Sequence, residues 1–417
     1  MADATIKTSV LERFLRYVTY DTQSDENSQT YPSTAKQLVL LDKLVEELKE
    51  IGLEDVRRDK HGCVFATVPA TTRKRRAPVI GFIAHVDTSP EAPGANVKPI
   101  IHRKWKGEDI VLPDDPTAVL RLKDNPGLQN QKGHDIITAS GTTLLGADNK
   151  AGVAEIVAAA EYLVKNPRIK HGKIRIAFTP DEEVGGGTKH FSVKKFGAYC
   201  AYTMDGEARG HVEAETFSAD SMTVTFTGFN THPGFAKGRM VNAIKVAADF
   251  INRLPRTWMS PETTADREGY VHPYVIEAAV EKTSVKFLIR DFITAALKEK
   301  ENVLEFLARE TVAAWPGSSV TCKVDESYRN MRQVLEKHPK IVEHAREAIR
   351  RAGLKVVEVP IRGGTDGARL SFMGLPTPNV FAGEHNFHSR LEWISVQDMD
   401  KAVEVIVNIA RVWEEKA

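Results

Sequence analysis

Cysteine is scarce in this chain of 417 residues. Only Cys63, Cys200 and Cys322 are present, far apart and odd in number, which fits buried thiols in a reducing compartment and argues against a disulfide-stabilised scaffold. The chain also lacks any run of about 18 consecutive apolar residues, so the sequence predicts no membrane-spanning helix. Glu12 and Arg13 interrupt the apolar pattern near the N-terminus, which is unlike a secretory signal. We therefore expect a cytoplasmic protein.

An excess of charge of either sign is missing as well. The 57 Lys and Arg side chains nearly balance the 56 Asp and Glu side chains, and the net charge is +1. Neither nucleic acid nor a membrane surface is expected as a partner, because both attract strongly basic proteins. The sequence also contains no phosphate-binding Walker loop, no G-x-S-x-G nucleophile motif and no H-E-x-x-H zinc motif.

The pattern of expected helices and strands changes twice along the chain. Strands and helices alternate at both ends, which predicts an α/β fold with a mostly parallel sheet and helices on both faces. The middle of the chain has the order β-α-β-β-α-β, typical of a ferredoxin-like α+β domain. We expect domain boundaries at 1–212, 213–326 and 327–417, with the middle domain inserted into the first. Helices are expected at 35–50, 151–164, 240–253 and 334–351, and strands at 78–84, 174–178, 274–280, 284–291 and 356–361.

Acidic residues and histidines follow the predicted strands of the α/β domain. The carboxyl ends of parallel strands meet in one crevice, so these side chains are expected to lie together. Singly, each could be a surface acid or a structural histidine. Together, so many carboxylates would repel one another without a cation, and two divalent metals would satisfy them. Imidazole and carboxylate ligands suit zinc best, with manganese or cobalt possible. The residues are His85, Asp87, Asp148, Glu182, Glu183, Asp205 and His388.

Several sequence strings resemble the M20 metallopeptidase family. They are HVDTSP (85–90), GTTLLGADNKAGVAEI (141–156), FTPDEEVGGG (178–187), YTMDG (202–206), THPGFAKGRMVNA (231–243), IRGGTDGARLSFMGLP (361–376) and NFHSRLEW (386–393). The resemblance runs nearly end to end. It implies a dinuclear-metal exopeptidase fold whose inserted domain serves as lid and dimerisation domain. More narrowly, it points to those members that release the N-terminal residue from tripeptides.

The resemblance also implies roles for the strand-end residues. Five would be metal ligands: Asp148 bridging both metals, His85 and Asp205 completing one site, and Glu183 and His388 completing the other. Glu182 would stay free of metal and act as general base, taking a proton from the metal-bridging water to give the attacking hydroxide. The family also implies a cis peptide between Asp148 and Asn149. His385 is the local competitor of His388 as a ligand.

Four further residues have a functional and a structural interpretation. Asp87 would accept the second ring N–H of His85, or it caps a loop. The resemblance makes His232 an oxyanion-stabilising residue that reaches a neighbouring active site in a dimer, although before Pro-Gly it could be a turn residue. Arg290 and Arg362 would hold the carboxylate or backbone of the peptide, or they form salt bridges.

The expected activity is therefore a metallo-aminopeptidase acting on short peptides, tripeptides in particular, and working as a homodimer. One alternative is a dipeptidase or N-acyl-amino-acid deacylase of the same family. Another is a peptide- or metal-binding relative without catalytic activity, which would have no use for an unligated Glu182.

Overall fold

The computed structural model describes residues 8–417, which form two compact units. The smaller unit consists of residues 215–332 and 360–364, and the remaining described residues form the larger unit. The short segment 360–364 therefore packs with the smaller unit, although it lies within the region 327–417 that the sequence pattern places in the larger domain.

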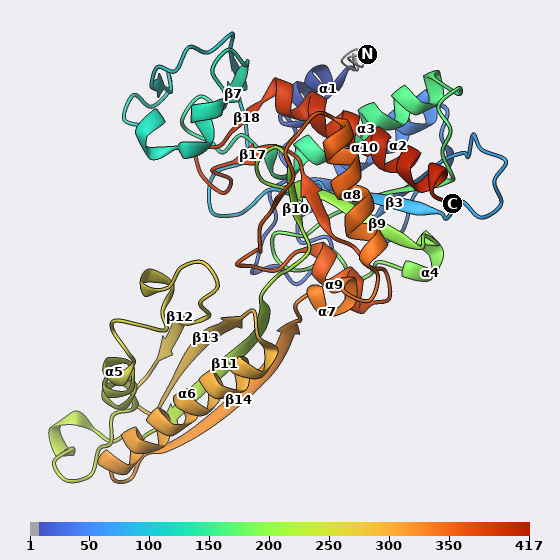
Figure 1. The fold of residues 1–417 in the computed structure, drawn as a ribbon. Helices are drawn as coiled ribbons and strands as arrows, with labels where there is room; N and C mark the ends of the chain where they lie inside the picture. Colours follow the sequence, from blue (N-terminus) through green and yellow to red (C-terminus); the bar gives the residue numbers. More distant parts are fainter. Residues whose placement is uncertain (1–7) are drawn as a thin grey trace. The chain divides into compact units, whose positions relative to one another are not determined.

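An eight-stranded sheet forms the centre of the larger unit (Figure 1). Its middle strands β8, β3, β9 and β16 are parallel to one another, whereas β1 and β2 at one edge and the pair β10–β16 are antiparallel. The predicted, mostly parallel sheet is thus confirmed, with antiparallel strands added towards its edges. In sheet order the strands are β1 (Glu54–Arg58), β2 (Val64–Val68), β8 (Ile174–Thr179), β3 (Ile80–His85), β9 (Cys200–Gly206), β16 (Asn379–Phe381), β10 (His211–Glu213) and β15 (Val357–Glu358).

Helices cover both faces of this sheet, as predicted. On one face α3 packs against β3 and β9, and α1 and α10 pack against α3. On the other face Ile83 of β3 lies in a buried cluster with Phe196 of α4 and Leu370 of α9. The helices of the larger unit are α1 (Val10–Tyr17), α2 (Gln37–Ile51), α3 (Ala147–Lys165), α4 (Val193–Phe196), α8 (Pro339–Arg351), α9 (Asp366–Phe372) and α10 (Val396–Glu415).

Two features of the larger unit differ from the sequence prediction. The prediction of a single helix over 334–351 is wrong, because α7 (Arg332–Leu335) ends before Pro339 and a separate helix, α8, begins at Pro339. Proline has no N–H and a fixed φ, so it suits the first turn of a new helix and not the interior of a longer one. The other feature is a second, small sheet that no predicted element covered. Its strands, in sheet order, are β17 (Glu384–His385), β18 (Trp393–Ser395), β7 (Ile136–Thr138) and β4 (Ile100–His102).

The small sheet has its own hydrophobic core, in which Trp105 and Trp393 are the largest side chains. A two-stranded ribbon of β5 (Ile110–Val111) and β6 (Val119–Leu120) and two short 3-10 helices, η1 (Leu122–Asp124) and η2 (Pro126–Asn130), complete this part of the chain. β17 and β18 follow β16 in sequence, so the small sheet fixes the segment that leads to His388.

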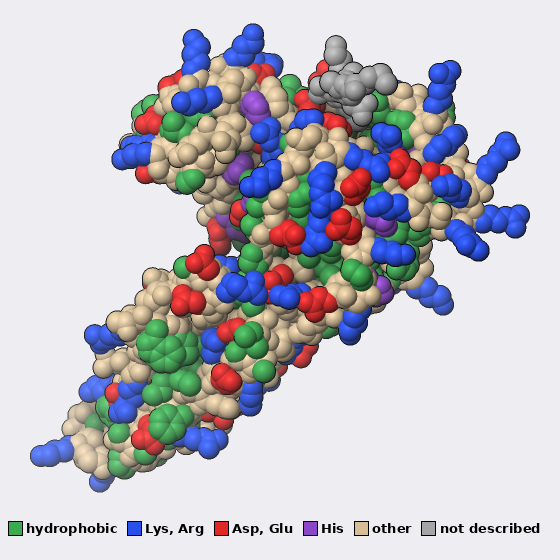
Figure 2. Space-filling model, viewed as in Figure 1, with side chains coloured by type: hydrophobic (Ala, Val, Ile, Leu, Met, Phe, Trp, Pro, Cys, Tyr) green, Lys and Arg blue, Asp and Glu red, His purple; other side chains and the backbone are tan. Residues whose placement is uncertain are grey.

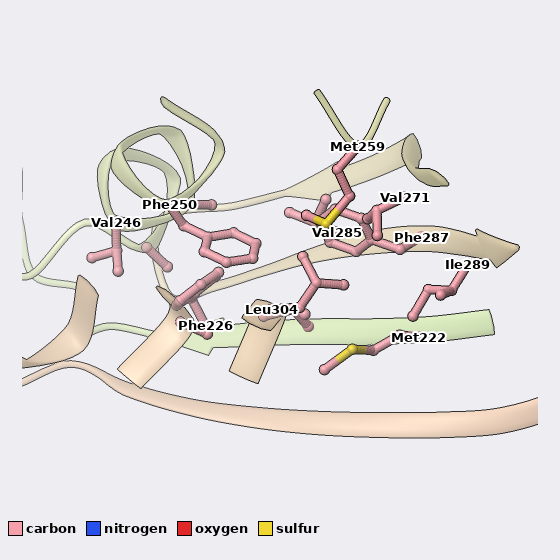
Figure 3. Close-up of a cluster of buried hydrophobic side chains, with 14 of the residues drawn as sticks. Met222, Phe226, Val246, Phe250, Met259, Val271, Val285, Phe287, Ile289 and Leu304 are labelled. Carbon is pink, nitrogen blue, oxygen red and sulfur yellow. The ribbon is translucent and has the colours of Figure 1, made fainter. Parts of the chain in front are cut away.

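The smaller unit is a four-stranded antiparallel sheet in the order β12-β13-β11-β14, with α5 and α6 packed on it. Alternate residues of β13 are buried, among them Val285, Phe287 and Ile289, and they belong to the core drawn in Figure 3, in which the ring of Phe250 packs against those of Phe226 and Phe287. The chain order and strand order confirm the predicted ferredoxin-like domain. Its elements are β11 (Ser218–Thr227), η3 (Pro233–Phe235), α5 (Ala243–Arg253), η4 (Pro261–Thr263), β12 (Tyr270–Ala278), β13 (Lys282–Asp291), α6 (Thr294–Ala314) and β14 (Ser319–Tyr328).

The surface carries charges of both signs. On the face drawn in Figure 2, basic and acidic side chains are interspersed, in keeping with their nearly equal numbers. Within residues 8–417, no helix is both long and apolar enough to cross a bilayer. All three cysteines are free, with Cys63 and Cys200 buried and Cys322 half-buried.

Candidate metal centre

The ends of the parallel strands bring the predicted residues to one edge of the large sheet. His85 is the last residue of β3, Asp205 lies at the end of β9, and Glu183 follows β8. Because β8, β3 and β9 are adjacent and parallel, their carboxyl ends lie side by side. Asp148 joins them from the start of α3, where Asp148 and Asn149 have non-helical backbone angles and the peptide between them is cis. The cis peptide implied by the family resemblance is thus confirmed.

Five of these side chains form two groups that share Asp148. In each group one ligand atom per residue lies within 4.8 Å of the others. His85 Nε2 lies 3.0 Å from Asp148 Oδ1 and 3.3 Å from Asp205 Oδ1. His388 Nε2 lies 3.3 Å from Asp148 Oδ2 and 2.7 Å from Glu183 Oε2. The two histidines therefore face different oxygens of Asp148, so this residue can offer a separate oxygen to each group.

The electrostatics of the two groups also fit cations. Burial and the Asp148 carboxylate raise the pKa of Glu183 to about 8. Although burial opposes it, hydrogen bonds to Asp148 and Glu183 raise the pKa of His388 to about 11, and Asp205 and Asp148 likewise raise the pKa of His85. The Oε1 atom of Glu183 is buried and has no hydrogen-bond partner in the described structure. The carboxylates and histidines thus favour a positive charge among them. A divalent ion would supply that charge in place of the protons on Glu183 and the histidines.

The imidazole and carboxylate groups at this centre are suited to divalent metal ions such as zinc. Each group offers one imidazole nitrogen together with oxygens from two carboxylates, and half-buried or buried positions limit competition from water. The residues present therefore fit two divalent ions, and Asp148 is the residue common to both groups.

Asp87 connects the two sides of this centre. Its carboxylate is fully buried and lies 3.3 Å from Nδ1 of His85, whose Nδ1 is also 3.1 Å from the backbone oxygen of Asp87. The same carboxylate accepts the backbone N–H groups of Glu182 and Glu183, at 3.0 and 3.1 Å. Asp87 thus contacts a candidate ligand and also accepts hydrogen bonds from the loop that carries both glutamates.

Glu182 belongs to neither group of ligand atoms. Burial raises the pKa of its carboxyl well above the ordinary value, and the nearby carboxylates of Asp366 and Asp205 raise it further. A cation bound to the adjacent ligands would lower that pKa and favour the ionised form. Glu182 is therefore placed beside the ligands and free of them.

The glutamate loop is also held from its other side. Asp181 has a left-handed backbone conformation with φ of 61°, and its carboxylate accepts hydrogen bonds from Ser33 N at 2.6 Å and Gln37 Nε2 at 2.6 Å. At the end of the loop, a Cβ on Gly187 would lie 2.4 Å from the nearer carboxylate oxygen of Asp366. Glycine is thus required there because the buried Asp366 side chain approaches the backbone closely.

His388, and not His385, lies in the ligand groups. The ring of His385 stacks on Trp393 with a centroid distance of 3.9 Å and an interplanar angle of 8°. Burial lowers the pKa of His385 to about 4, so its ring is neutral near pH 7. His385 therefore packs within the small sheet and lies outside the ligand groups.

The remaining three predicted residues belong to the smaller unit. His232 is exposed at the start of η3, where its Nδ1 accepts the backbone N–H of Gly234 at 3.2 Å. The guanidinium carbon of Arg290 lies 5.2 Å from the centre of the Tyr328 ring. Arg362 Nη1 donates to the backbone oxygens of residues 266 and 268, at 2.8 and 2.9 Å, so much of its guanidinium is already engaged.

Two buried acids near the centre received no role from the sequence. Asp366, at the start of α9, accepts a hydrogen bond from Thr179 Oγ1 at 3.1 Å, and Glu392 accepts one from the backbone N–H of Asp148 at 3.0 Å. Both lie in strings that carry the family resemblance, GGTDG (363–367) and NFHSRLEW (386–393). The residue type alone gave no signal, because partners far away in sequence define both environments.

Comparison with known proteins finds a matching family model and close relatives. The model of "Peptidase family M20/M25/M40" matches residues 136–412. Peptidase T of Geobacillus kaustophilus is 48% identical over 412 residues, which cover 99% of this chain and 100% of that protein. Peptidase T of Clostridium botulinum is 47% identical over 404 residues, covering 97% of this chain and 98% of that protein.

Solved structures share the fold. Aminopeptidase PepT from Bacillus cereus has a TM-score of 0.74 at 22% identity, and the match covers 97% of this chain and 98% of that one. A dinuclear metal-binding peptidase of the M20 family from Bacillus subtilis has a TM-score of 0.66 at 16% identity and 98% coverage of both chains. By the family match and by its relatives, this chain belongs to peptidase family M20/M25/M40.

Proposed function

We propose that this protein is a two-metal aminopeptidase that releases the N-terminal residue from tripeptides. The observation that carries the proposal is the pair of ligand groups joined by Asp148, with the carboxylate of Glu182 beside them and outside both. The preference for tripeptides is supported by relatives named Peptidase T, which match this chain over nearly its full length.

The protein's own residues divide the chemistry among them. His85 and Asp205 would hold one metal ion, Glu183 and His388 the other, and Asp148 both. When bound, the metal ions polarise the scissile carbonyl and lower the pKa of water towards about 7. Glu182 accepts the proton of the attacking water and delivers it to the amine nitrogen that leaves. Asp87 fixes the ring of His85 and the position of the Glu182 backbone, so that ligand and base keep their relative geometry.

Residues of the smaller unit would complete substrate binding. His232 is proposed to stabilise the oxyanion of the tetrahedral intermediate, a role that its exposed position on a loop supports. Arg290 is proposed to bind the substrate carboxylate. Arg362 is proposed to act beside it, and its hydrogen bonds to backbone oxygens at 266 and 268 would hold it in a fixed orientation.

We further propose zinc as the metal, a homodimer as the working form and a cytoplasmic location. Mixed imidazole and carboxylate donors support zinc, with manganese or cobalt as substitutes. The edge strand β12 exposes Tyr274 and Ile276, which are 48% and 51% accessible, and an apolar open edge favours pairing through the smaller unit. The three free cysteines support a reducing compartment.

A substrate panel tests the proposed activity. The zinc-loaded protein is incubated with a tripeptide such as Ala-Ala-Ala, the matching dipeptide and tetrapeptide, and the N-acetylated tripeptide, and the released amino acids are quantified. We expect fastest release from the free tripeptide and none from the N-acetylated form. Preference for a dipeptide or an N-acyl amino acid would make the protein a dipeptidase or deacylase of the same family. Metal binding with no hydrolysis of any substrate would indicate a catalytically silent relative.

A further inference from the structure

Glu392 is a buried carboxylate that the proposed chemistry does not use. It is 1% exposed and lies directly before β18, four residues after the candidate ligand His388. It belongs to neither group of candidate ligand atoms.

All three hydrogen bonds that the structure gives this carboxylate come from the backbone around Asp148. Oε2 accepts the N–H groups of Leu145 and Gly146, both at 2.7 Å. Oε1 accepts the N–H of Asp148 at 3.0 Å. One side chain therefore fixes the short loop that ends at the residue shared by the two ligand groups.

This loop needs such a partner. Leu145 is fully buried, and Gly146 is buried with a left-handed backbone at φ of 82°, so water cannot satisfy their N–H groups. The backbone at Asp148 and Asn149 is also non-helical. The hydrogen bonds within α3 therefore do not fix the direction of the Asp148 side chain. The segment that carries His388 supplies the missing acceptor, and it thereby ties two ligands of the second group together.

We propose that Glu392 is a positioning residue that aims the Asp148 carboxylate at both metal ions. The inference rests on the proposed two-metal centre. Because Asp148 belongs to both groups, loss of this support weakens both metal sites together, whereas loss of His85 weakens one. A merely structural role would lower the stability of the fold and leave the two affinities of the folded protein unchanged.

Glu392→Gln is the direct test. The amide keeps the size of the side chain but can accept on one atom only, so its NH₂ group opposes either the Asp148 N–H or the N–H groups of residues 145 and 146. Glu392→Asp keeps two acceptor oxygens on a shorter stem and serves if the glutamine variant does not fold. Glu155→Gln is the matched control: Glu155 is fully buried on α3, and neither of its oxygens has a hydrogen-bond partner in the described structure.

The readout is zinc affinity, measured on metal-free protein by competition with a chromogenic chelator, with the thermal unfolding of the same samples. We expect the two zinc affinities of Glu392→Gln both to fall by about 10- to 100-fold, those of Glu392→Asp to fall less, and those of Glu155→Gln to stay within about twofold of wild type. Two wild-type zinc affinities in folded Glu392→Gln would overturn the inference, and so would a loss confined to one site. If the wild-type protein binds two zinc ions but cleaves no tripeptide, the proposed function fails while the positioning role of Glu392 is still decided by these affinities.

Discussion

Replacing Asp87 with asparagine should affect both the position of the proposed base Glu182 and the affinity for metal. The carboxylate of Asp87 accepts two backbone N–H groups, one on each oxygen, and one of those oxygens also lies 3.3 Å from His85 Nδ1. In Asp87→Asn the best orientation keeps the carbonyl towards Glu182 N and His85, which leaves the NH₂ group facing the N–H of Glu183. One hydrogen bond to a charged acceptor is lost and a buried donor is left without a partner, which costs about 1.5–3 kcal/mol.

That cost should appear in the stability of the metal-free protein, and metal binding should weaken in addition. We expect the free energy of unfolding of the metal-free protein to fall by about 1.5–3 kcal/mol in urea titrations. Zinc affinity should fall by about 10- to 100-fold, because His85 loses part of its supporting contact and the Glu183 backbone shifts. Asp398→Asn is the control, since Asp398 is also fully buried but interacts with Gln131 and Arg209 and not with the glutamate loop. Asp87→Asn with wild-type zinc affinity and wild-type stability would refute this reasoning.

Two further changes test contacts around the centre and far from it. Gly187→Ala places a Cβ 2.4 Å from a carboxylate oxygen of Asp366 and should lower the free energy of unfolding by about 1–3 kcal/mol in a denaturant titration; an unchanged midpoint would contradict the close contact. Burial, with Lys416 and Lys340 nearby, lowers the pKa of His344 to about 4, so the folded protein holds this ring neutral. The unfolded chain protonates it near pH 6.5, and stability should fall by up to about 3 kcal/mol as the pH drops from about 6.5 to about 4. That part of the pH dependence should disappear in His344→Gln, and an identical pH profile would contradict it.

Much of the centre could be predicted because its ligands stand at the ends of regular elements. The apolar run before His85 and the alternation before Glu183 identify the strands, and the parallel arrangement places both residues at one edge. Helical spacing of apolar residues likewise predicted α2, which the structure places at Gln37–Ile51. Pro339 indicates that a helix begins at that position. The prediction of one continuous helix did not take this proline into account.

The small sheet and the supporting acids could not be predicted in the same way. Strands such as β17 and β18 have two and three residues, too few for a period to emerge, and their core joins Trp105 to Trp393 across most of the chain. Glu392 meets Gly146, which lies 246 residues earlier. Its role follows from a contact that only the folded chain creates, and no local pattern in the sequence encodes it.

The most direct test of the account is the metal content and the turnover of Glu182→Gln, measured on the same sample. Metal is counted per chain by atomic emission after removal of loosely bound ions, and release of the first residue from a tripeptide is followed by chromatography. Because Glu182 lies outside both ligand groups, the variant should retain two metal ions per chain and lose about 100- to 10,000-fold in turnover. Loss of a metal ion would make Glu182 a ligand, and turnover close to wild type would show that another group takes the proton.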